Sequence, residues 1–309
     1  MSKLEITLGR IKLSNPVLGA SGCVGHGFEL EGYTDLSRYG ALSMKTVTLE
    51  PRAGNRPPRI CEVSDGMLSS IGLQNPGMAS YIQHYKDKIK TACRPDQIII
   101  SIGGNEVEDY VKSAAAIAEN FSPDEIAALE VNAACPNVAH GGGAVGSSPG
   151  KLQDVLSAVR KAVDFPIIAK INTNEGNFCE VAKAAQHEGA DALYIANTPM
   201  GMAIDIRRRK PVLGNVKGPV SGPAVLPQGI AKTWELYKAV SLPIIGSGGI
   251  YTWEAAVQYM LAGASAVGIG SAHFVNPNAA VEILDGVEKY MEENHVLDLR
   301  EIIGAAHAF

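Results

Sequence analysis

The chain has 309 residues, of which 46% are hydrophobic and 19% charged, a composition that suits a large globular protein rather than a disordered one. Lysine and arginine number 27 against 32 acidic residues, and the net charge of −5 excludes the strongly basic surface of a protein that binds nucleic acid or an anionic membrane. The N-terminus lacks the apolar core of a signal peptide and no stretch is long enough to cross a bilayer, so we expect a cytoplasmic protein.

The chain begins with an alternating segment and continues as repeated β–α units. Residues 4–13 alternate between apolar and polar, which predicts a hairpin closing the floor of a barrel. Short apolar runs then predict strands at residues 17–20, 41–46, 98–102, 128–132, 167–171, 192–196, 244–247 and 266–269. Amphipathic stretches between them predict helices at residues 106–119, 151–163, 178–188, 230–240 and 252–261.

Eight strands joined by crossover helices predict an α/β fold, a (β/α)8 TIM barrel, with residues 1–309 as one domain. Two β–α units are similar in sequence, because residues 164–168 resemble residues 241–245. This internal similarity favours a barrel over a doubly wound sheet. A long insertion at residues 49–75 is expected to build loops over the carboxyl face of the barrel. The basic run at residues 207–210 is expected to be a solvated loop.

Polar residues close several of the predicted strands, and in such barrels the carboxyl ends of the strands carry the active site. Lys45, Ser101, Asn132 and Lys170 each lie at or near the end of an apolar run, and Asn197 with Thr198 follows another. A lone lysine at a strand end can simply reach solvent. Two lysines that converge with amides on one face are harder to explain by packing.

Glycine-rich strand ends complete this face. They are Ser221-Gly222, residues 246–249 and residues 268–271. Glycine lets backbone N–H groups approach a phosphate closely, and a phosphate site near the last two strands is common in this fold. Each cluster alone fits a tight turn, but the pair predicts a phosphorylated cofactor. No G-x-G-x-x-G follows the first strand, which disfavours a dinucleotide fold.

One thiol stands out among the five cysteines. Cys135 lies between Asn132 and Asn137, directly before a Gly-Ser loop at residues 141–150 that could act as a flap. A thiol can serve as a base or nucleophile, whereas the ordinary interpretation is a small buried side chain at a turn. The other cysteines, at 23, 61, 93 and 179, form no C-x-x-C, so we expect neither disulfides nor a metal cluster in this chain.

These residues resemble the class 1 dihydroorotate dehydrogenases, in particular the NAD-linked class 1B catalytic subunit. The likeness rests on Ala20-Ser21-Gly22, Lys45-Thr46, Ile71-Gly72-Leu73-Gln74-Asn75-Pro76-Gly77, Asn132-x-x-Cys135-Pro136-Asn137, Asn197-Thr198-x-x-Gly201-Met202, residues 211–215, Ser221-Gly222-Pro223-Ala224 and the paired glycine motifs. The resemblance implies a barrel that carries FMN at its carboxyl mouth and oxidises (S)-dihydroorotate to orotate in pyrimidine synthesis.

The resemblance also implies residue roles. Cys135 would take the C5 proton of dihydroorotate while hydride passes from C6 to flavin N5. Lys170 would stabilise the reduced flavin, and Lys45 would bridge flavin and substrate. The implied cofactor-binding residues are Ala20, Ser21, Gly22, Lys45, Thr46, Ser101, Asn132, Lys170, Ala196, Gly222, Gly248, Gly249, Gly270 and Ser271. The implied substrate-binding residues are Lys45, Ser69, Ser70, Ile71, Gly72, Leu73, Asn132, Asn137, Asn197 and Thr198.

Class 1B membership implies a partner subunit with FAD and a 2Fe-2S cluster that passes electrons to NAD, and a homodimer within a heterotetramer. The chain departs from the usual family pattern at four places. Ser69 replaces the usual asparagine before Ile71-Gly72-Leu73, and Ser101 replaces a common asparagine. Cys23-Val24 replaces the usual Thr-Phe, and Leu226 replaces a common lysine. A related cyclic amide as substrate and a fumarate-linked class 1A enzyme therefore stay open. Outside the family, an aldolase with a Schiff base on Lys170 and a non-catalytic binding barrel are the alternatives.

Overall fold

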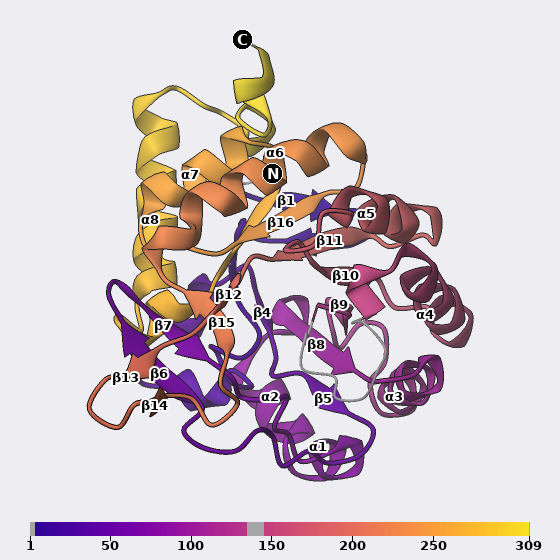
Figure 1. Ribbon diagram of the computed structural model, residues 1–309. Coiled ribbons are helices and arrows are strands. Elements are labelled where there is room, and N and C mark those ends of the chain that lie inside the picture. The colour runs from indigo at the N-terminus through magenta and orange to yellow at the C-terminus, as the bar shows by residue number, and fades with distance from the viewer. Residues whose placement is uncertain (1–3, 135–144, 309) are drawn as a thin grey trace.

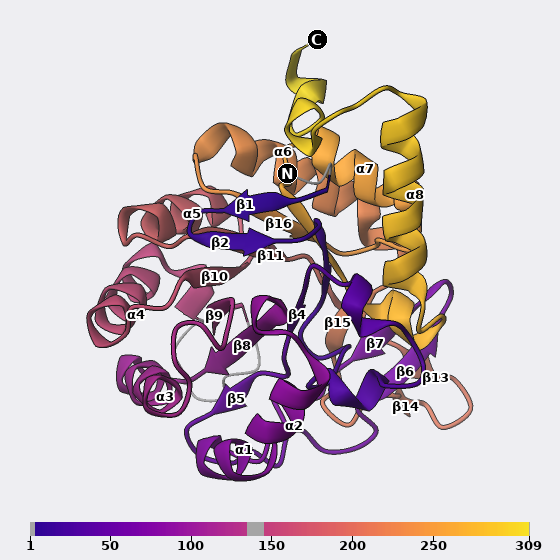
Figure 2. The same cartoon turned by 180° about the vertical axis from the view of Figure 1, so that it is seen from behind.

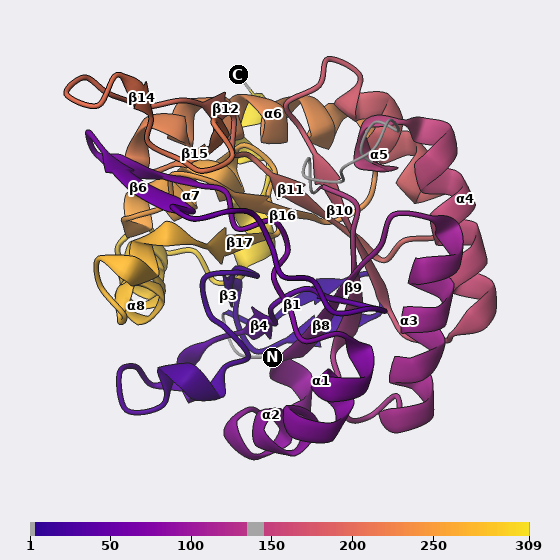
Figure 3. The ribbon, with the colours of Figure 1, turned by 60° about the horizontal axis from the view of Figure 1, so that its bottom comes forward.

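Eight parallel strands close into a barrel at the centre of the protein (Figure 3). The structure is a computed structural model and describes residues 4–134 and 145–308. In chain order the barrel strands are β3 (Val17–Gly19), β4 (Ala41–Ser43), β8 (Ile98–Gly103), β9 (Ala128–Asn132), β10 (Ile167–Asn172), β11 (Ala192–Ala196), β16 (Ile244–Ser247) and β17 (Ala266–Ile269). The barrel closes where β4 pairs with β8, Leu42 opposite Ile98. The predicted TIM barrel is confirmed.

Helices surround the strands, as Figures 1 and 3 show. They are α1 (Met78–His84), α2 (Lys86–Ala92), α3 (Val107–Asn120), α4 (Pro149–Ala162), α5 (Phe178–His187), α6 (Leu226–Ala239), α7 (Trp253–Leu261) and α8 (Ala279–Glu293). The five predicted helices are α3 to α7, although α6 begins at Leu226 rather than at residue 230. Its first turn contains Pro227, which is tolerated there because that N–H has no partner within a helix. Within residues 4–134 and 145–308, no helix has the length and apolar character needed to cross a bilayer.

The predicted N-terminal hairpin is confirmed and lies across the barrel floor (Figure 2). Strand β1 (Ile6–Leu8) pairs antiparallel with β2 (Ile11–Leu13), and the side chains of Leu8 and Leu13 are buried. Its turn is fastened to the chain before β11, because Arg10 Nε donates to Asp191 Oδ1 at 2.9 Å. The opposite end of the barrel is thereby left for the residues that follow the strands.

Asp191 is the anchor of this floor. Its carboxylate, 7% exposed, also accepts from Arg160 at 2.9 Å and from the Ile167 backbone N–H at 2.8 Å. Burial opposes ionisation, but the hydrogen bonds from Arg10 and Ile167 outweigh it and lower the pKa of Asp191. Because the folded-state pKa lies below its ordinary value of about 4, this carboxylate stabilises the fold above about pH 4. The contribution is lost as pH falls through the lowered pKa.

We expect Asp191→Ala to lower the free energy of unfolding by about 3 kcal/mol at pH 7, because it leaves the buried Ile167 N–H and the partly exposed Arg10 and Arg160 side chains without their acceptor. The matched control is Asp164→Ala. That carboxylate also contacts Arg10, at 3.1 Å, but is 95% exposed, so a change within about 0.5 kcal/mol is expected. Urea unfolding at pH 7 measures both. Equal losses in the two variants would contradict the assignment of Asp191 as the anchor.

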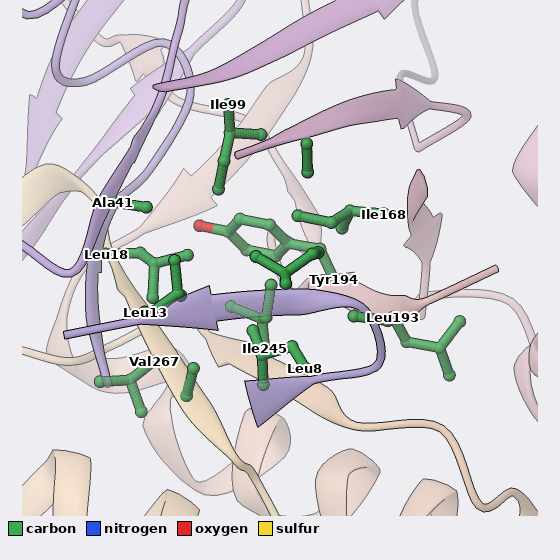
Figure 4. Packing of buried hydrophobic residues seen from close by; sticks show 14 of the residues in the cluster. Leu8, Leu13, Leu18, Ala41, Ile99, Ile168, Leu193, Tyr194, Ile245 and Val267 are labelled. Atoms are coloured by element: carbon green, nitrogen blue, oxygen red, sulfur yellow. The ribbon is translucent and has the colours of Figure 1, made fainter. Parts of the chain in front are cut away.

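The barrel interior is filled by side chains, as Figure 4 shows. Tyr194 of β11 lies among Leu8, Leu18, Ile99 and other buried apolar residues, so hairpin and strands share one core. A Cβ on Gly268 would lie 1.9 Å from the Tyr194 hydroxyl oxygen, so glycine is required where β17 passes the ring. The barrel interior next to the N-terminal hairpin is therefore filled by packed side chains.

The insertion at residues 49–75 folds back over the structure, as predicted for loops on the carboxyl face, and contains a hairpin that was not predicted. Strands β6 (Ile60–Val63) and β7 (Gly66–Ser69) join β15 (Gly218–Ser221) and β12 (Met200–Gly201) in a four-stranded sheet. A second hairpin, β13 (Ile204–Asp205) and β14 (Lys210–Pro211), projects from it (Figure 1), with the basic residues 207–210 exposed. The short β5 (Val47–Thr48) extends the barrel beside β8.

Candidate active site

The carboxyl ends of β8, β9 and β10 bring together the polar residues predicted from the strand ends. These strands are neighbours, with Ser101 opposite Glu130 and Lys170 opposite Asn132. Lys45 lies two residues beyond β4, which pairs with β8 on the other side. Lys45, Asn132 and Lys170 are each partly exposed. One sector of the mouth therefore presents two ammonium groups and an amide.

A chain of hydrogen bonds connects Asn132 to the interior of the barrel. Asn132 Nδ2 donates to Thr46 Oγ1 at 2.9 Å, Thr46 Oγ1 lies 2.9 Å from Ser101 Oγ, and Ser101 Oγ donates to Glu130 Oε1 at 2.7 Å. Each hydroxyl has one proton. Since Ser101 uses its proton on Glu130, the Thr46 hydroxyl donates to Ser101 and accepts from Asn132. Every donor in this series of hydrogen bonds therefore points toward Glu130.

Glu130 is a site residue that sequence reasoning missed. It lies in the middle of β9, is fully buried, and accepts from Ser43 Oγ and Ser101 Oγ, both at 2.7 Å. Lys170 Nζ donates to its Oε1 at 3.4 Å and lies 4.5 Å from the centre of the Tyr194 ring. A glutamate inside an otherwise apolar strand run was the signal that could have found it, because unpaired carboxylates are almost never fully buried.

Among the described cysteines, Cys23 lies in the loop that follows β3. Burial raises the pKa of Cys23 to about 11, although the positive charges of Lys170 and Lys45 oppose this rise. A thiol with so high a pKa is protonated at neutral pH and is a poor base. Cys23 is therefore held as a neutral side chain.

The glycine-rich strand ends lie on the opposite side of the mouth. Strands β16 and β17 are neighbours, with Ser247 opposite Gly268. Gly248 and Gly249 have φ values of 105° and 78°, which other residues rarely adopt, and a Cβ on Gly249 would lie 2.5 Å from Leu226 N. The Tyr251 hydroxyl donates to Ser271 Oγ at 2.9 Å and ties the two strand ends together. Two adjacent turns that contain glycine suit a phosphate group, because backbone N–H groups can approach it closely.

The remaining predicted cofactor residues line the same end. Ser21 Oγ donates to Met44 O at 2.7 Å and lies 3.3 Å from Thr46 Oγ1, so the loop after β3 touches the hydrogen-bonded chain. Ala20, Gly22, Ala196, Gly270 and Ser271 follow or end barrel strands and are at least partly exposed, whereas Gly222 is buried.

Asn197 is placed differently from the prediction. Its side chain is fully buried, its Nδ2 donates to Val225 O at 2.9 Å, and its Oδ1 accepts from Lys232 Nζ at 2.9 Å. The amide thus bonds to Val225 and to Lys232 of α6, while its Nδ2 lies 3.0 Å from where a Cβ on Gly248 would be. Thr198, the next residue, is partly exposed.

The predicted substrate loop follows β7. Ser69 ends that strand and is partly exposed with Ile71 and Gly72, while Ser70 and Leu73 are buried. Ser70 Oγ accepts from Asn55 Nδ2 at 2.9 Å, which fixes the loop to the insertion.

Cys135, Asn137 and the first part of the predicted flap lie outside the described residues. The chain leaves the described structure at Ala134, whose N–H donates to Asn132 Oδ1 at 3.3 Å. It re-enters at Val145, and the N–H of the next residue, Gly146, donates to Ala133 O at 2.9 Å. Both flanks of the segment are therefore fixed at the carboxyl end of β9, beside Asn132.

The family model for dihydroorotate dehydrogenase matches residues 3–291. The chain belongs to the dihydroorotate dehydrogenase family. It is 46% identical over 304 residues to a protein of Desulforamulus reducens named "Dihydroorotate dehydrogenase B (NAD(+)), catalytic subunit", covering 98% of each chain. A protein of the same name from Desulforudis audaxviator is 44% identical over 99% of this chain and 98% of its own. The resemblance to the NAD-linked branch of the dihydroorotate dehydrogenases is thus confirmed.

Proposed function

We propose that this chain oxidises dihydroorotate to orotate with FMN bound at the carboxyl mouth of the barrel. The observation that carries the proposal is the arrangement of that mouth in a member of this family. Lys170 and Asn132 lie on adjacent strands, and the adjacent turns after β16 and β17, with Gly248 and Gly249 in positive-φ conformations, lie on the other side. Cationic and amide groups suit a flavin ring and substrate, and bare backbone turns suit a phosphate.

The residues of the mouth fit FMN chemically. Gly222, Gly248, Gly249, Gly270 and Ser271 would hold the phosphate end. Ala20, Ser21, Gly22, Thr46, Ser101 and Ala196 would hold the ring with Lys45, Asn132 and Lys170. Bound FMN supplies a hydride acceptor, which no amino-acid side chain can replace. Lys170, kept in place by Glu130 and by the Tyr194 ring, provides a fixed positive charge where negative charge develops.

Proton transfer in this proposal belongs to Cys135, which takes the C5 proton of dihydroorotate as its C6 hydride leaves. The raised pKa of Cys23 supports this choice between the two thiols, because Cys23 is poorly suited to act as a base. Lys45, Asn132, Asn137, Thr198 and the loop at residues 69–73 would hold the substrate. Asn197 would join them only if its amide turned away from Lys232 and Val225, which hold it now.

Electrons leave through a partner subunit in this proposal. The name of the relatives as catalytic subunits supports such a partner. We propose that the partner carries FAD and a 2Fe-2S cluster and delivers electrons to NAD, and that two copies of this chain form a homodimer within a heterotetramer. Mass measurement of the complex purified with its partner tests the stoichiometry.

The test of the cofactor assignment is spectroscopic. Protein purified without added cofactor should be yellow, and the flavin released on denaturation should be FMN at about one per chain. Colourless protein that forms a borohydride-trapped adduct with a carbonyl substrate at Lys170 would instead support the aldolase alternative.

Ser69 favours one variant of the proposal, a related cyclic amide as substrate. Its hydroxymethyl group reaches less far than the asparagine usual in relatives of this class, which removes one amide contact. Comparing flavin reduction by dihydroorotate with reduction by dihydrouracil and hydantoins decides between them. Faster flavin reduction by another amide would identify that amide as the substrate, and the proposed flavin chemistry would stay the same.

A further inference from the structure

The buried carboxylate of Glu130 is not explained by the fold. Neighbouring interior positions are filled by apolar residues such as Ile99 and Ile168, which are fully buried. Removing a carboxylate from water costs several kcal/mol, and apolar replacements of buried ion pairs often keep or raise stability. A charged residue at this depth therefore indicates a function other than packing.

The contacts of Glu130 identify it as an acceptor only. Ser43 donates to Oε2, while Ser101 and Lys170 donate to Oε1. The chain through Thr46 also ends here, so its donors all point at this carboxylate. An ionised carboxylate accepts on both oxygens and donates on neither, which matches this arrangement.

We propose that Glu130 sets the reduction potential of the flavin by forming a neutral pair with Lys170. This inference rests on the proposed function, since it requires FMN at the mouth. Lys45, two residues beyond β4, and Lys170 of β10 bring two positive charges to the carboxyl end of the barrel. The negative charge of Glu130, which lies in the barrel interior, offsets the positive charge of Lys170. Without it, the mouth would favour the reduced cofactor more strongly and would hold back the electrons that the partner must receive.

The pairing also fixes where the ammonium lies. Lys170 Nζ is held between Glu130 Oε1 and the face of the Tyr194 ring, and its side chain is only 11% exposed. Both contacts come from adjacent strands, β9 and β11, on either side of β10. The charge is therefore placed by rigid elements of the barrel rather than by a loop.

Glu130→Gln tests this directly, because it removes the charge and keeps the shape. Its amide oxygen can face Ser101 and Lys170 while its NH2 donates to Ser43, whose hydroxyl can rotate to accept. With FMN-loaded protein we expect the reduced cofactor to gain about tenfold in binding relative to the oxidised form. For a two-electron couple this is a rise of about 30 mV in midpoint potential. Redox titration against indicator dyes measures it without substrate or turnover.

The matched control is Ser43→Ala, which removes one hydrogen bond to Glu130 but leaves its charge and its contact with Lys170. We expect the binding of reduced relative to oxidised cofactor to change by less than about twofold. If Glu130→Gln fails to fold, Glu130→Asp retains the charge but withdraws it from Lys170, and a smaller rise is expected.

An unchanged or lowered potential in the folded glutamate variant would overturn the proposal, and so would an equal rise in Ser43→Ala. Failure of the proposed function is distinguishable, because protein that binds no FMN gives no potential to measure. A flavin that titrates normally but ignores the charge of residue 130 would refute this inference alone.

Discussion

Cys135→Ala is expected to slow reduction of the bound flavin by dihydroorotate about 10²- to 10⁴-fold, since a positioned general base contributes that much. Alanine removes the only group of that side chain able to take the C5 proton. The FMN content should be unchanged, because the substitution leaves Asn132 in place and the other residues proposed to hold the cofactor lie on strand ends other than that of β9. Anaerobic stopped-flow mixing with dihydroorotate, followed by the visible flavin absorbance, measures the rate.

The matched control is Cys23→Ala, which removes a described thiol from the loop that follows β3. Because burial keeps that thiol protonated, its loss should change the reduction rate by less than about tenfold. A large loss with Cys23→Ala and a normal rate with Cys135→Ala would reverse the assignment of the base. Loss of FMN from Cys135→Ala would show that Cys135 is structural.

Lys170→Ala should slow flavin reduction about 10²- to 10³-fold, the usual cost of removing one preorganised electrostatic contact to a developing charge. The dissociation constant for substrate should change much less, because Lys170 is paired with Glu130 below the mouth rather than with a substrate group. Rates measured over a range of dihydroorotate concentrations separate the two quantities.

Lys183→Ala is the control, since that lysine pairs with Glu180 on the exposed surface of α5 and no change is expected. Lys170→Ala also leaves Glu130 without its cation, so the thermal midpoint of the variant should fall. An unchanged reductive rate in a folded, FMN-loaded Lys170→Ala protein would contradict the electrostatic role. A rate loss that disappears at saturating substrate would show a binding role instead.

The barrel could be predicted from sequence because each strand is a short apolar run bounded by turns, and the signal is local. The sheet over the barrel was not predicted, because it depends on partners far away in the chain. The pairing of Leu68 in β7 with Val220 in β15 joins segments about 150 residues apart, and nothing near residue 68 reports on residue 220. Helix α8 was missed although Ile283, Leu284, Val287 and Met291 are buried on one face, a helical spacing that the sequence does show.

The site was predictable where it depends on strand ends and less so below them. Lys45, Asn132 and Lys170 meet as expected because parallel strands share one carboxyl face. Glu130 was missed because it lies one layer deeper, where the expectation is an apolar side chain. The orientation of Asn197 could not be predicted either, since an amide at a strand end can turn toward the mouth or toward a helix, and Lys232 decides this in the structure.

The most direct test of the central claim is anaerobic mixing of the purified yellow protein with dihydroorotate, without partner subunit or NAD. We predict rapid loss of the oxidised flavin absorbance and formation of one orotate per FMN. Flavin that dithionite reduces but that dihydroorotate leaves oxidised at saturating concentration would contradict the assignment of this mouth as a dihydroorotate-oxidising site.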